Sequence, residues 1–211
     1  MMQIFIHGLG QTPSSWENTV KDMNIQTNVN RPNLSELLKG HKINYTNLYQ
    51  AFSEHCNTFS ESLNLCGLSL GGILALNYAI EYPERVQSLV LIGTQYKMPK
   101  MLLRFQNIIF RFMPNSMFEQ MGFGKKDFIE LSRSMMELDF SNDLKKISCP
   151  VLVVCGEQDN ANKKASIGLN ESLSNSEIQI VDGSGHEVNI DRPKQLGDVI
   201  NDFYNRNGIF K

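Results

Sequence analysis

Short apolar runs that alternate with helical patterns are the feature of this sequence that most restricts its fold. The runs are rich in Val, Ile and Leu. They predict strands at residues 2–6, 63–66, 86–93, 150–156 and 176–183 and, more weakly, 25–30. Helices are expected at residues 16–23, 46–60, 71–82 and 193–204. Because continuous apolar strands joined by helices are typical of a parallel sheet covered on both faces, we expect an α/β fold with a mostly parallel, doubly wound sheet.

Residues 97–140 interrupt this alternation, because the pattern there is helical throughout. The segment holds seven of the ten methionines and seven of the twelve phenylalanines in the sequence. We expect a helical cap that is inserted into a single domain spanning residues 1–211 and covers one end of its sheet. The apolar side chains of this cap either line a pocket for a substrate or form the core of the cap itself.

The first part of the expected cap carries a basic stripe opposite an apolar stripe. The basic residues are Lys97, Lys100, Arg104 and Arg111, and the apolar residues are Met101, Phe105, Ile108 and Phe112. This pattern predicts a helix with a solvated face over a buried face. Contact with a membrane surface or with an acidic partner is the alternative.

Composition excludes several classes of protein. A formal net charge of −2 provides no basic field for binding nucleic acid. The first ten residues have no basic lead, so we expect no signal peptide, and no window is apolar for long enough to insert stably into a membrane. The four cysteines show neither metal-binding spacing nor the density of a disulfide scaffold. We therefore expect a reduced, cytoplasmic protein and leave its oligomeric state open.

A serine stands between glycines in the stretch LCGLSLGGI, where a strand gives way to a helix. Such a stretch can be a loop of no special function or a phosphate-binding turn. A dinucleotide-binding turn needs an acidic residue near the end of the next strand, and a phosphate-binding loop needs Gly-Lys-Ser/Thr; both are absent. A strained turn that exposes a nucleophile needs small residues two positions away on each side. Gly67 and Gly71 occupy these positions around Ser69, which favours a nucleophile elbow.

A nucleophilic serine needs a base, and that base needs an orienting acid. Of the four histidines, His41 and His55 lie in polar segments, and His7 lies in a turn where we expect a structural role. His186 instead follows a strong strand in a glycine-rich loop. Asp159 follows another strand. These two residues are the candidates for base and acid.

The expected sheet brings the three candidates together. Ser69, Asp159 and His186 each follow a strand, and all strands of a parallel sheet end at the same edge, where open α/β sheets bind their ligands. Asp182 is a rival acid, but it stands only four residues before His186, too near along the chain to reach around to the imidazole. The sequence therefore predicts a catalytic site made of Ser69, Asp159 and His186.

Five stretches together resemble the motifs of the α/β-hydrolase superfamily over nearly the whole chain. They are HGLG, GLSLGG, YPERVQSLVLIG, GEQD and GSGH. In that family they form the oxyanion turn, the nucleophile elbow, a helix-to-strand passage, the acid turn and the histidine loop. Small carboxylesterases with a helical cap, together with related acyl-transfer and lyase enzymes, are the members that the chain resembles most.

The chain departs from the family pattern in two places. Only one strand is expected before the His-Gly turn, where family members usually have an antiparallel pair, so we expect a sheet that is shortened at the N-terminus. Residues 30–35 read NRPNLS where the family often has a glycine-rich turn, so one wall of the pocket is expected to differ.

The resemblance implies a role for each candidate residue. Ser69 attacks a carbonyl carbon, His186 takes the proton of the serine and returns it to the leaving group, and Asp159 orients the imidazole. The backbone N–H groups of Leu9 and Leu70 are expected to form the oxyanion hole. Neither a metal ion nor an organic cofactor is expected.

The expected function is hydrolysis of a carboxylic ester or thioester with a small to medium acyl group, through an acyl-enzyme. The partner expected is thus a small-molecule acyl substrate. A lyase or cofactor-biosynthesis enzyme with the same three residues is the alternative, because one fold hosts both chemistries. A non-catalytic binding protein is a third class, and such a protein would more naturally have lost one of the three residues.

Overall fold

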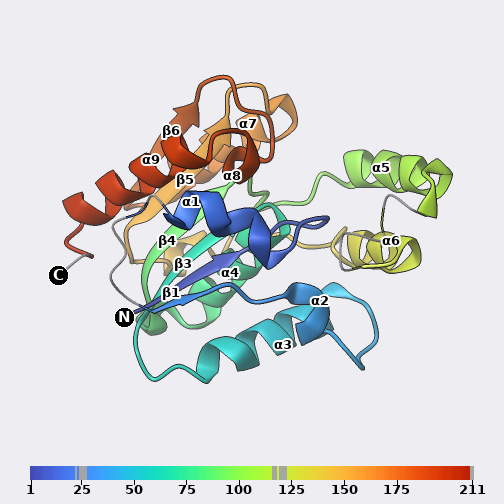
Figure 1. Cartoon of the computed structure of the whole chain (residues 1–211), viewed down its shortest axis with the longest axis horizontal. Coiled ribbons are helices and arrows are strands. Elements are labelled where there is room, and N and C mark those ends of the chain that lie inside the picture. The colour runs from blue at the N-terminus through green and yellow to red at the C-terminus, as the bar shows by residue number, and fades with distance from the viewer. Residues whose placement is uncertain (22, 24–27, 116–117, 119–122, 210–211) are drawn as a thin grey trace.

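A six-stranded sheet forms the centre of the part of the chain that the structure, a computed structural model, describes (Figure 1). The structure describes residues 1–21, 23, 28–115, 118 and 123–209. Within these ranges, residues 102, 104–106 and 109 are described by their backbone only. In sheet order the strands are β2 (Val29–Asn30), β1 (Met2–Ile6), β3 (Leu63–Leu68), β4 (Val86–Ile92), β5 (Val151–Gly156) and β6 (Ser176–Val181).

Helices cover both faces of the sheet, as the sequence predicted. One face carries α1 (Glu17–Lys21), α8 (Val188–Asp191) and α9 (Pro193–Arg206). The other carries α2 (Leu34–Leu37), α3 (Tyr45–Asn57), α4 (Leu70–Glu81) and α7 (Asn160–Ser172). Short 3-10 helices lie at Pro13–Trp16, Pro83–Arg85 and Leu144–Lys146. No helix within the described ranges is both long enough and apolar enough to cross a membrane.

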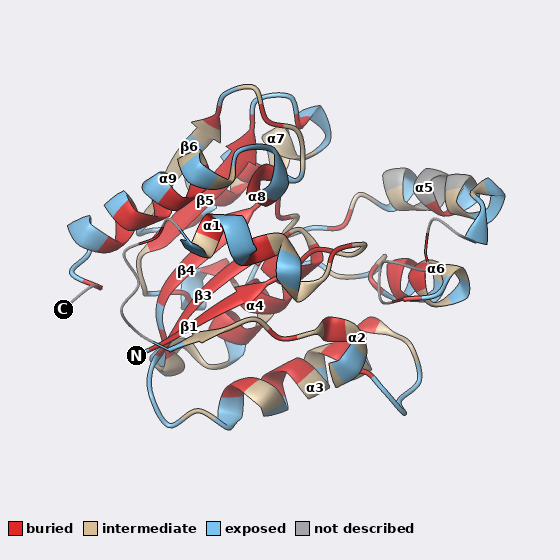
Figure 2. Ribbon diagram, in the orientation of Figure 1, coloured by how far each residue is buried: buried red, intermediate tan, exposed pale blue. Residues whose placement is uncertain are grey.

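Strands β1, β3, β4 and β5 are buried, apart from one exposed residue on β4, because each presents apolar side chains to two cores (Figure 2). On β1, Ile4 and Ile6 point into the core under α3 and α4, whereas Phe5 points to the opposite core. There the ring of Phe5 packs against Trp16, with 5.4 Å between the ring centroids. Side chains alternate along a strand, so an uninterrupted apolar run fills both layers at once.

All strand pairings between described residues are parallel. The strands predicted at 2–6, 63–66, 86–93, 150–156 and 176–183 are confirmed. The weak strand predicted at 25–30 is shorter than expected: β2 comprises Val29 and Asn30, and residues 25–27 lie outside the described part.

Three helices were missed by the sequence interpretation. Two of them, α2 and α8, are four residues long, too short for a helical period to be visible. The third, α7, is long but reads NANKKASIGLNES, and only Ser166 and Leu169 on it are buried. A helix that covers the sheet with so few apolar residues has no clear amphipathic pattern.

Residues 97–140, here called the cap segment, contain α5 (Lys100–Phe112) and α6 (Lys125–Ser134), which stand off the sheet in Figure 1. The two ends of the segment pair with each other. Met98 N–H donates to the carbonyl of Leu138 at 3.0 Å, and Phe140 N–H donates to that of Tyr96 at 2.8 Å. The cap segment therefore leaves and re-enters the rest of the chain at one place.

Helix α5 does not bury the predicted apolar stripe, so that prediction was wrong. Met101, Ile108 and Phe112 are 77%, 52% and 85% exposed, whereas Asn107 is 4% exposed. The buried face of α5 is instead the one that carries Asn107 and the partly buried Leu103. The apolar pattern failed because the helix has two apolar faces. The side chains of Arg104 and Phe105, which belonged to the prediction, lie outside the described part.

Candidate active site

Ser69 sits on a strained turn between β3 and α4. Its φ is 53° and its ψ is −113°, and no other non-glycine residue in the described ranges has a positive φ. Such a conformation costs roughly 1–3 kcal/mol. A Cβ on Gly67 would lie 2.3 Å from the carbonyl oxygen of Gly71, and one on Gly71 would lie 2.2 Å from that of Ile6. Contacts this short exclude any side chain, so the two glycines are a steric requirement of the turn.

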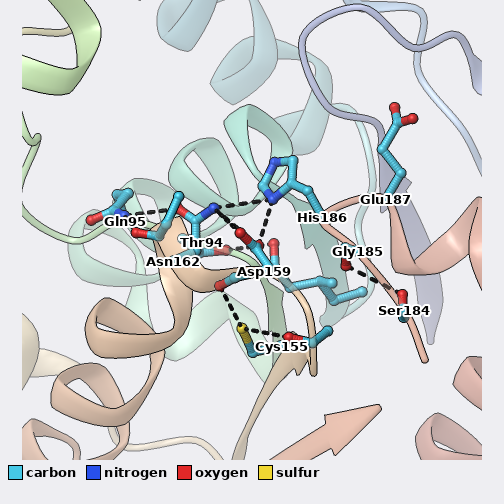
Figure 3. A network of polar contacts seen from close by, with 12 residues as sticks. Thr94, Gln95, Cys155, Asp159, Asn162, Ser184, Gly185, His186 and Glu187 are labelled. Atoms are coloured by element: carbon cyan, nitrogen blue, oxygen red, sulfur yellow. Dashed lines mark hydrogen bonds and ion pairs between the residues drawn. The ribbon is translucent and has the colours of Figure 1, made fainter. Parts of the chain in front are cut away.

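Asp159 and His186 meet at the carboxyl edge of the sheet, one after β5 and the other after β6 (Figure 3). The distance between His186 Nδ1 and Asp159 Oδ2 is 2.7 Å. Because a carboxylate can only accept, Nδ1 carries the proton and Nε2 is left free to act as a base. The rival acid Asp182 is exposed at the end of β6.

The Asp159 carboxylate is held in its charged form. Burial by itself raises the pKa of this group, but hydrogen bonds from His186 and Asn162 outweigh it and hold the pKa below its usual value. The Asn162 amide donates to both carboxylate oxygens, at 2.9 and 3.0 Å. Gln95 in turn donates to Asn162 Oδ1 at 2.7 Å and fixes its orientation (Figure 3). The carboxylate can therefore stabilise an imidazolium opposite it.

Asn162 and Gln95 were missed by the sequence interpretation, as was Gly93. A Cβ on Gly93 would lie 2.9 Å from both Cε1 and Nδ1 of His186, so a glycine at the end of β4 makes room for the imidazole. Its φ of 54° also favours glycine. The only available signals were a glycine after the strand and an amide three residues after the acid, and both are common in loops.

The turn after β1 lies beside Ser69, because a Cβ on Gly8 would lie 3.6 Å from Ser69 Cβ. Within this turn, Gly8 N–H donates to Gln11 Oε1 at 3.3 Å, and Gln11 N–H donates to the Gly8 carbonyl at 3.1 Å. Leu70 is the first residue of α4, where N–H groups have no acceptor within the helix. Leu9 and Leu70, the residues expected to form the oxyanion hole, both line the same pocket as Ser69.

This pocket brings all of the predicted catalytic residues together. It has a volume of about 470 Å³ and is lined by Ser69, Asp159 and His186 together with Leu9 and Leu70. Its opposite wall comes from the cap segment. The cap residues that line it are Met98, Pro99, Leu103, Phe128, Ser132 and Met135.

Some apolar residues of the cap segment form a core of the cap, and some line the pocket. The rings of Phe110, Phe118 and Phe128 pack edge to face with centroid distances of 5.0–6.2 Å and form a core of the cap. Phe128 also lines the pocket, as does Met135. The sequence could not decide between the two, because one side chain here does both.

His7 belongs to the framework of the site. Its Nε2 accepts the N–H of Leu34 at 3.2 Å, and its Nδ1 lies 2.9 Å from the Gly8 carbonyl. Nδ1 is therefore the protonated nitrogen. Burial lowers the pKa of this imidazole, which favours the neutral form that these contacts require. His7 thus joins the turn after β1 to the start of α2.

Comparison with known proteins agrees with this geometry. The model of the alpha/beta hydrolase fold family matches residues 60–136, which include the elbow and much of the cap segment. The chain has the α/β-hydrolase fold. The structure of a thermophilic esterase from Thermogutta terrifontis resembles that of this chain with a TM-score of 0.81, covering 98% of this chain and 90% of that one at 18% identity.

The curated relatives of this chain have different names. One, from Bacillus subtilis, is named as a 2-succinyl-6-hydroxy-2,4-cyclohexadiene-1-carboxylate synthase and is 25% identical over 67% of this chain and 65% of its own length. Another, monoacylglycerol lipase ABHD6 of Mus musculus, is 24% identical over 72% of this chain and 57% of its own length. Each match thus spans less than two thirds of the relative's length.

Proposed function

We propose that this α/β-hydrolase is a serine hydrolase that cleaves neutral carboxylic esters or thioesters with small to medium acyl groups. The observation that carries the proposal is the Asp159–His186 contact of 2.7 Å facing the same pocket as the strained Ser69. A carboxylate, an imidazole and a serine on a sharp turn are the groups that nucleophilic acyl transfer needs.

The reaction follows from these positions. Ser69 Oγ attacks the carbonyl carbon while His186 Nε2 takes its proton, and Asp159 stabilises the imidazolium. The N–H groups of Leu9 and Leu70 bind the oxyanion, and one such donor is typically worth about 3 kcal/mol. The imidazolium then protonates the departing alcohol or thiol. Water, activated by the same imidazole, hydrolyses the acyl-enzyme and restores the serine.

A neutral substrate is favoured by the charge of the pocket. No lysine or arginine is found among the described residues that line it, and its one carboxylate, Asp159, is engaged by His186 and Asn162. An anionic substrate would enter this apolar pocket without a counter-charge, which is costly.

A lyase or biosynthetic reaction is the second candidate, and the match to the Bacillus subtilis synthase favours it. The product in that protein's name is a carboxylate, and the described wall of the pocket offers such an anion no cation. We therefore place ester hydrolysis first.

Covalent labelling of the serine tests the proposal. A fluorophosphonate should label the wild-type protein and fail to label Ser69→Ala, whereas the exposed Ser60→Ala should be labelled like the wild type. Equal labelling of Ser69→Ala and the wild type would contradict the mechanism. Labelling of Ser69 without turnover of any p-nitrophenyl ester would favour the second candidate.

A further inference from the structure

The side chain of Gln11 is polar, 5% exposed and fully engaged in hydrogen bonds beside the site. Its Oε1 accepts Gly8 N–H at 3.3 Å and Asn189 Nδ2 at 3.2 Å. Its Nε2 donates to Asn189 Oδ1 at 3.1 Å and to Glu187 Oε1 at 2.9 Å. Gln11 and Asn189 therefore form a two-way amide pair, and the glutamine also holds the backbone of the turn that contains Leu9.

Asn189 is itself anchored. It is 1% exposed, and its Nδ2 donates to the carbonyl of Ser15 at 3.2 Å. Its own carbonyl accepts the hydroxyl of Thr19 at 3.4 Å. The partner of Gln11 is thus fixed by the 3-10 helix and by α1, so the amide pair has a rigid far end.

The pair connects the turn after β1 with helix α8, two segments that follow strands with no direct pairing to each other. Gln11 lies in the turn after β1 and Asn189 three residues after His186, beyond β6. In sheet order, β3, β4 and β5 separate these two strands. No direct strand pairing therefore links the turn that contains Leu9 to the segment that contains His186, whereas the hydrogen bonds of Gln11 to Asn189 and Glu187 link them directly.

We propose that Gln11 is a positioning residue that holds the oxyanion turn and the histidine loop in a fixed relation. This inference rests on the proposed function. The Leu9 N–H must face the oxygen of the same carbonyl group whose attack His186 assists. Small misplacements of catalytic groups are costly even when they arise outside the reacting groups, on the order of 100-fold for about 1 Å.

Variants that exchange the donor and the acceptor between Gln11 and Glu187 provide the test. Gln11→Glu keeps the size of the side chain but loses both Nε2 donors and places a carboxylate against Glu187. We expect kcat to fall about 10- to 100-fold with little change in KM, because the oxyanion contact matters mainly in the transition state. In the double variant Gln11→Glu/Glu187→Gln, the new amide donates to the new carboxylate but Asn189 Oδ1 still lacks its donor, so part of kcat should return.

Controls separate positioning from folding. Glu187→Gln alone should keep near wild-type kcat, since Gln11 can still donate to it, and Gln50→Met on the exposed face of α3 should change nothing. Gln11→Met, which has no hydrogen-bonding group, is the second variant should Gln11→Glu fold poorly. Urea unfolding of each variant identifies any that lose the fold.

The rate at which a fluorophosphonate labels Ser69 is a readout that needs no ester turnover. We expect the Gln11 variants to be labelled more slowly and the double variant to recover in part. The role of Gln11 would be overturned if Gln11→Glu and Gln11→Met were labelled at the wild-type rate. It would also be overturned if the labelling rate fell equally in Gln11→Glu and in the double variant. Absence of labelling in the wild type would instead overturn the proposed function.

Discussion

Ser69 shows how the geometry that the proposed mechanism requires is met by backbone strain at one residue. The turn places the hydroxyl at the edge of the pocket, and the glycines on each side are required because any Cβ there would overlap backbone atoms. Ser69 itself keeps a Cβ at a φ of 53°, where glycine is the residue without steric penalty. The surrounding packing of β1, β3 and α4 must therefore hold this residue in place.

Replacing the nucleophile by glycine is expected to stabilise the protein. Ser69→Gly relieves the strain, which is roughly 1–3 kcal/mol, and loses roughly 1 kcal/mol to the greater freedom of glycine in the unfolded chain. Ser69→Ala keeps the strain. Urea unfolding should therefore give Ser69→Gly a free energy of unfolding about 1 kcal/mol above that of Ser69→Ala. Equal values for the two variants would mean that the turn is not strained.

At the scale of elements, the cap segment limits the size of the site. Its two helices pack against each other through an aromatic core, and α6 is joined to α3 because Tyr45 N–H donates to Ser134 Oγ at 2.7 Å. The pocket therefore lies between a fixed sheet edge and a helical wall rather than in an open groove. A volume of about 470 Å³ suits an acyl chain of modest length.

Acyl length should accordingly control the rate. Each buried methylene contributes roughly 0.8 kcal/mol, so kcat/KM on p-nitrophenyl esters should rise about 4-fold per methylene and then fall once the pocket is full. Phe128→Ala, which removes a ring from the pocket wall, should move the optimum to longer chains. Phe110→Ala, in the cap core but outside the described wall, should lower stability without moving it. If kcat/KM did not depend on acyl length, the cap segment would not be the wall that limits the acyl group.

At the scale of the whole molecule, the sequence predicts those parts of the structure that depend on residues close together in the chain. The strands and the elbow glycines were visible because buried strands need apolar runs and a sharp turn needs small residues. The Gln11–Asn189 pair was not visible, because it joins the turn after β1 to helix α8, and the two residues are 178 positions apart in the chain. Helix α5 misled the interpretation, since an apolar stripe does not say which of two faces will be covered.

Stability should depend on pH through the buried His7. Burial lowers its pKa below the ordinary 6.5, so the unfolded chain binds more protons than the folded protein below that pH. The free energy of unfolding is therefore highest above pH 6.5 and falls as the pH decreases below it. His55 adds to this slope, because burial lowers its pKa as well.

Urea unfolding between pH 5 and pH 8 measures this effect. His7→Asn should show a smaller dependence on pH than the wild type, whereas His41→Asn, at an exposed position, should keep the full dependence. An unchanged slope in His7→Asn would show that the imidazole is not held neutral.

The position of the cap segment between β4 and β5 affects the order in which the chain can fold. The 17 residues 69–85 separate β3 from β4, whereas the 58 residues 93–150 separate β4 from β5. Closing the longer loop costs about 1 kcal/mol more in chain entropy. The half of the sheet that carries Ser69 can thus pair before the half that carries Asp159 and His186. A chain caught at that stage displays a nucleophile without its base, and recovery of catalysis during refolding reports the joining of the two halves.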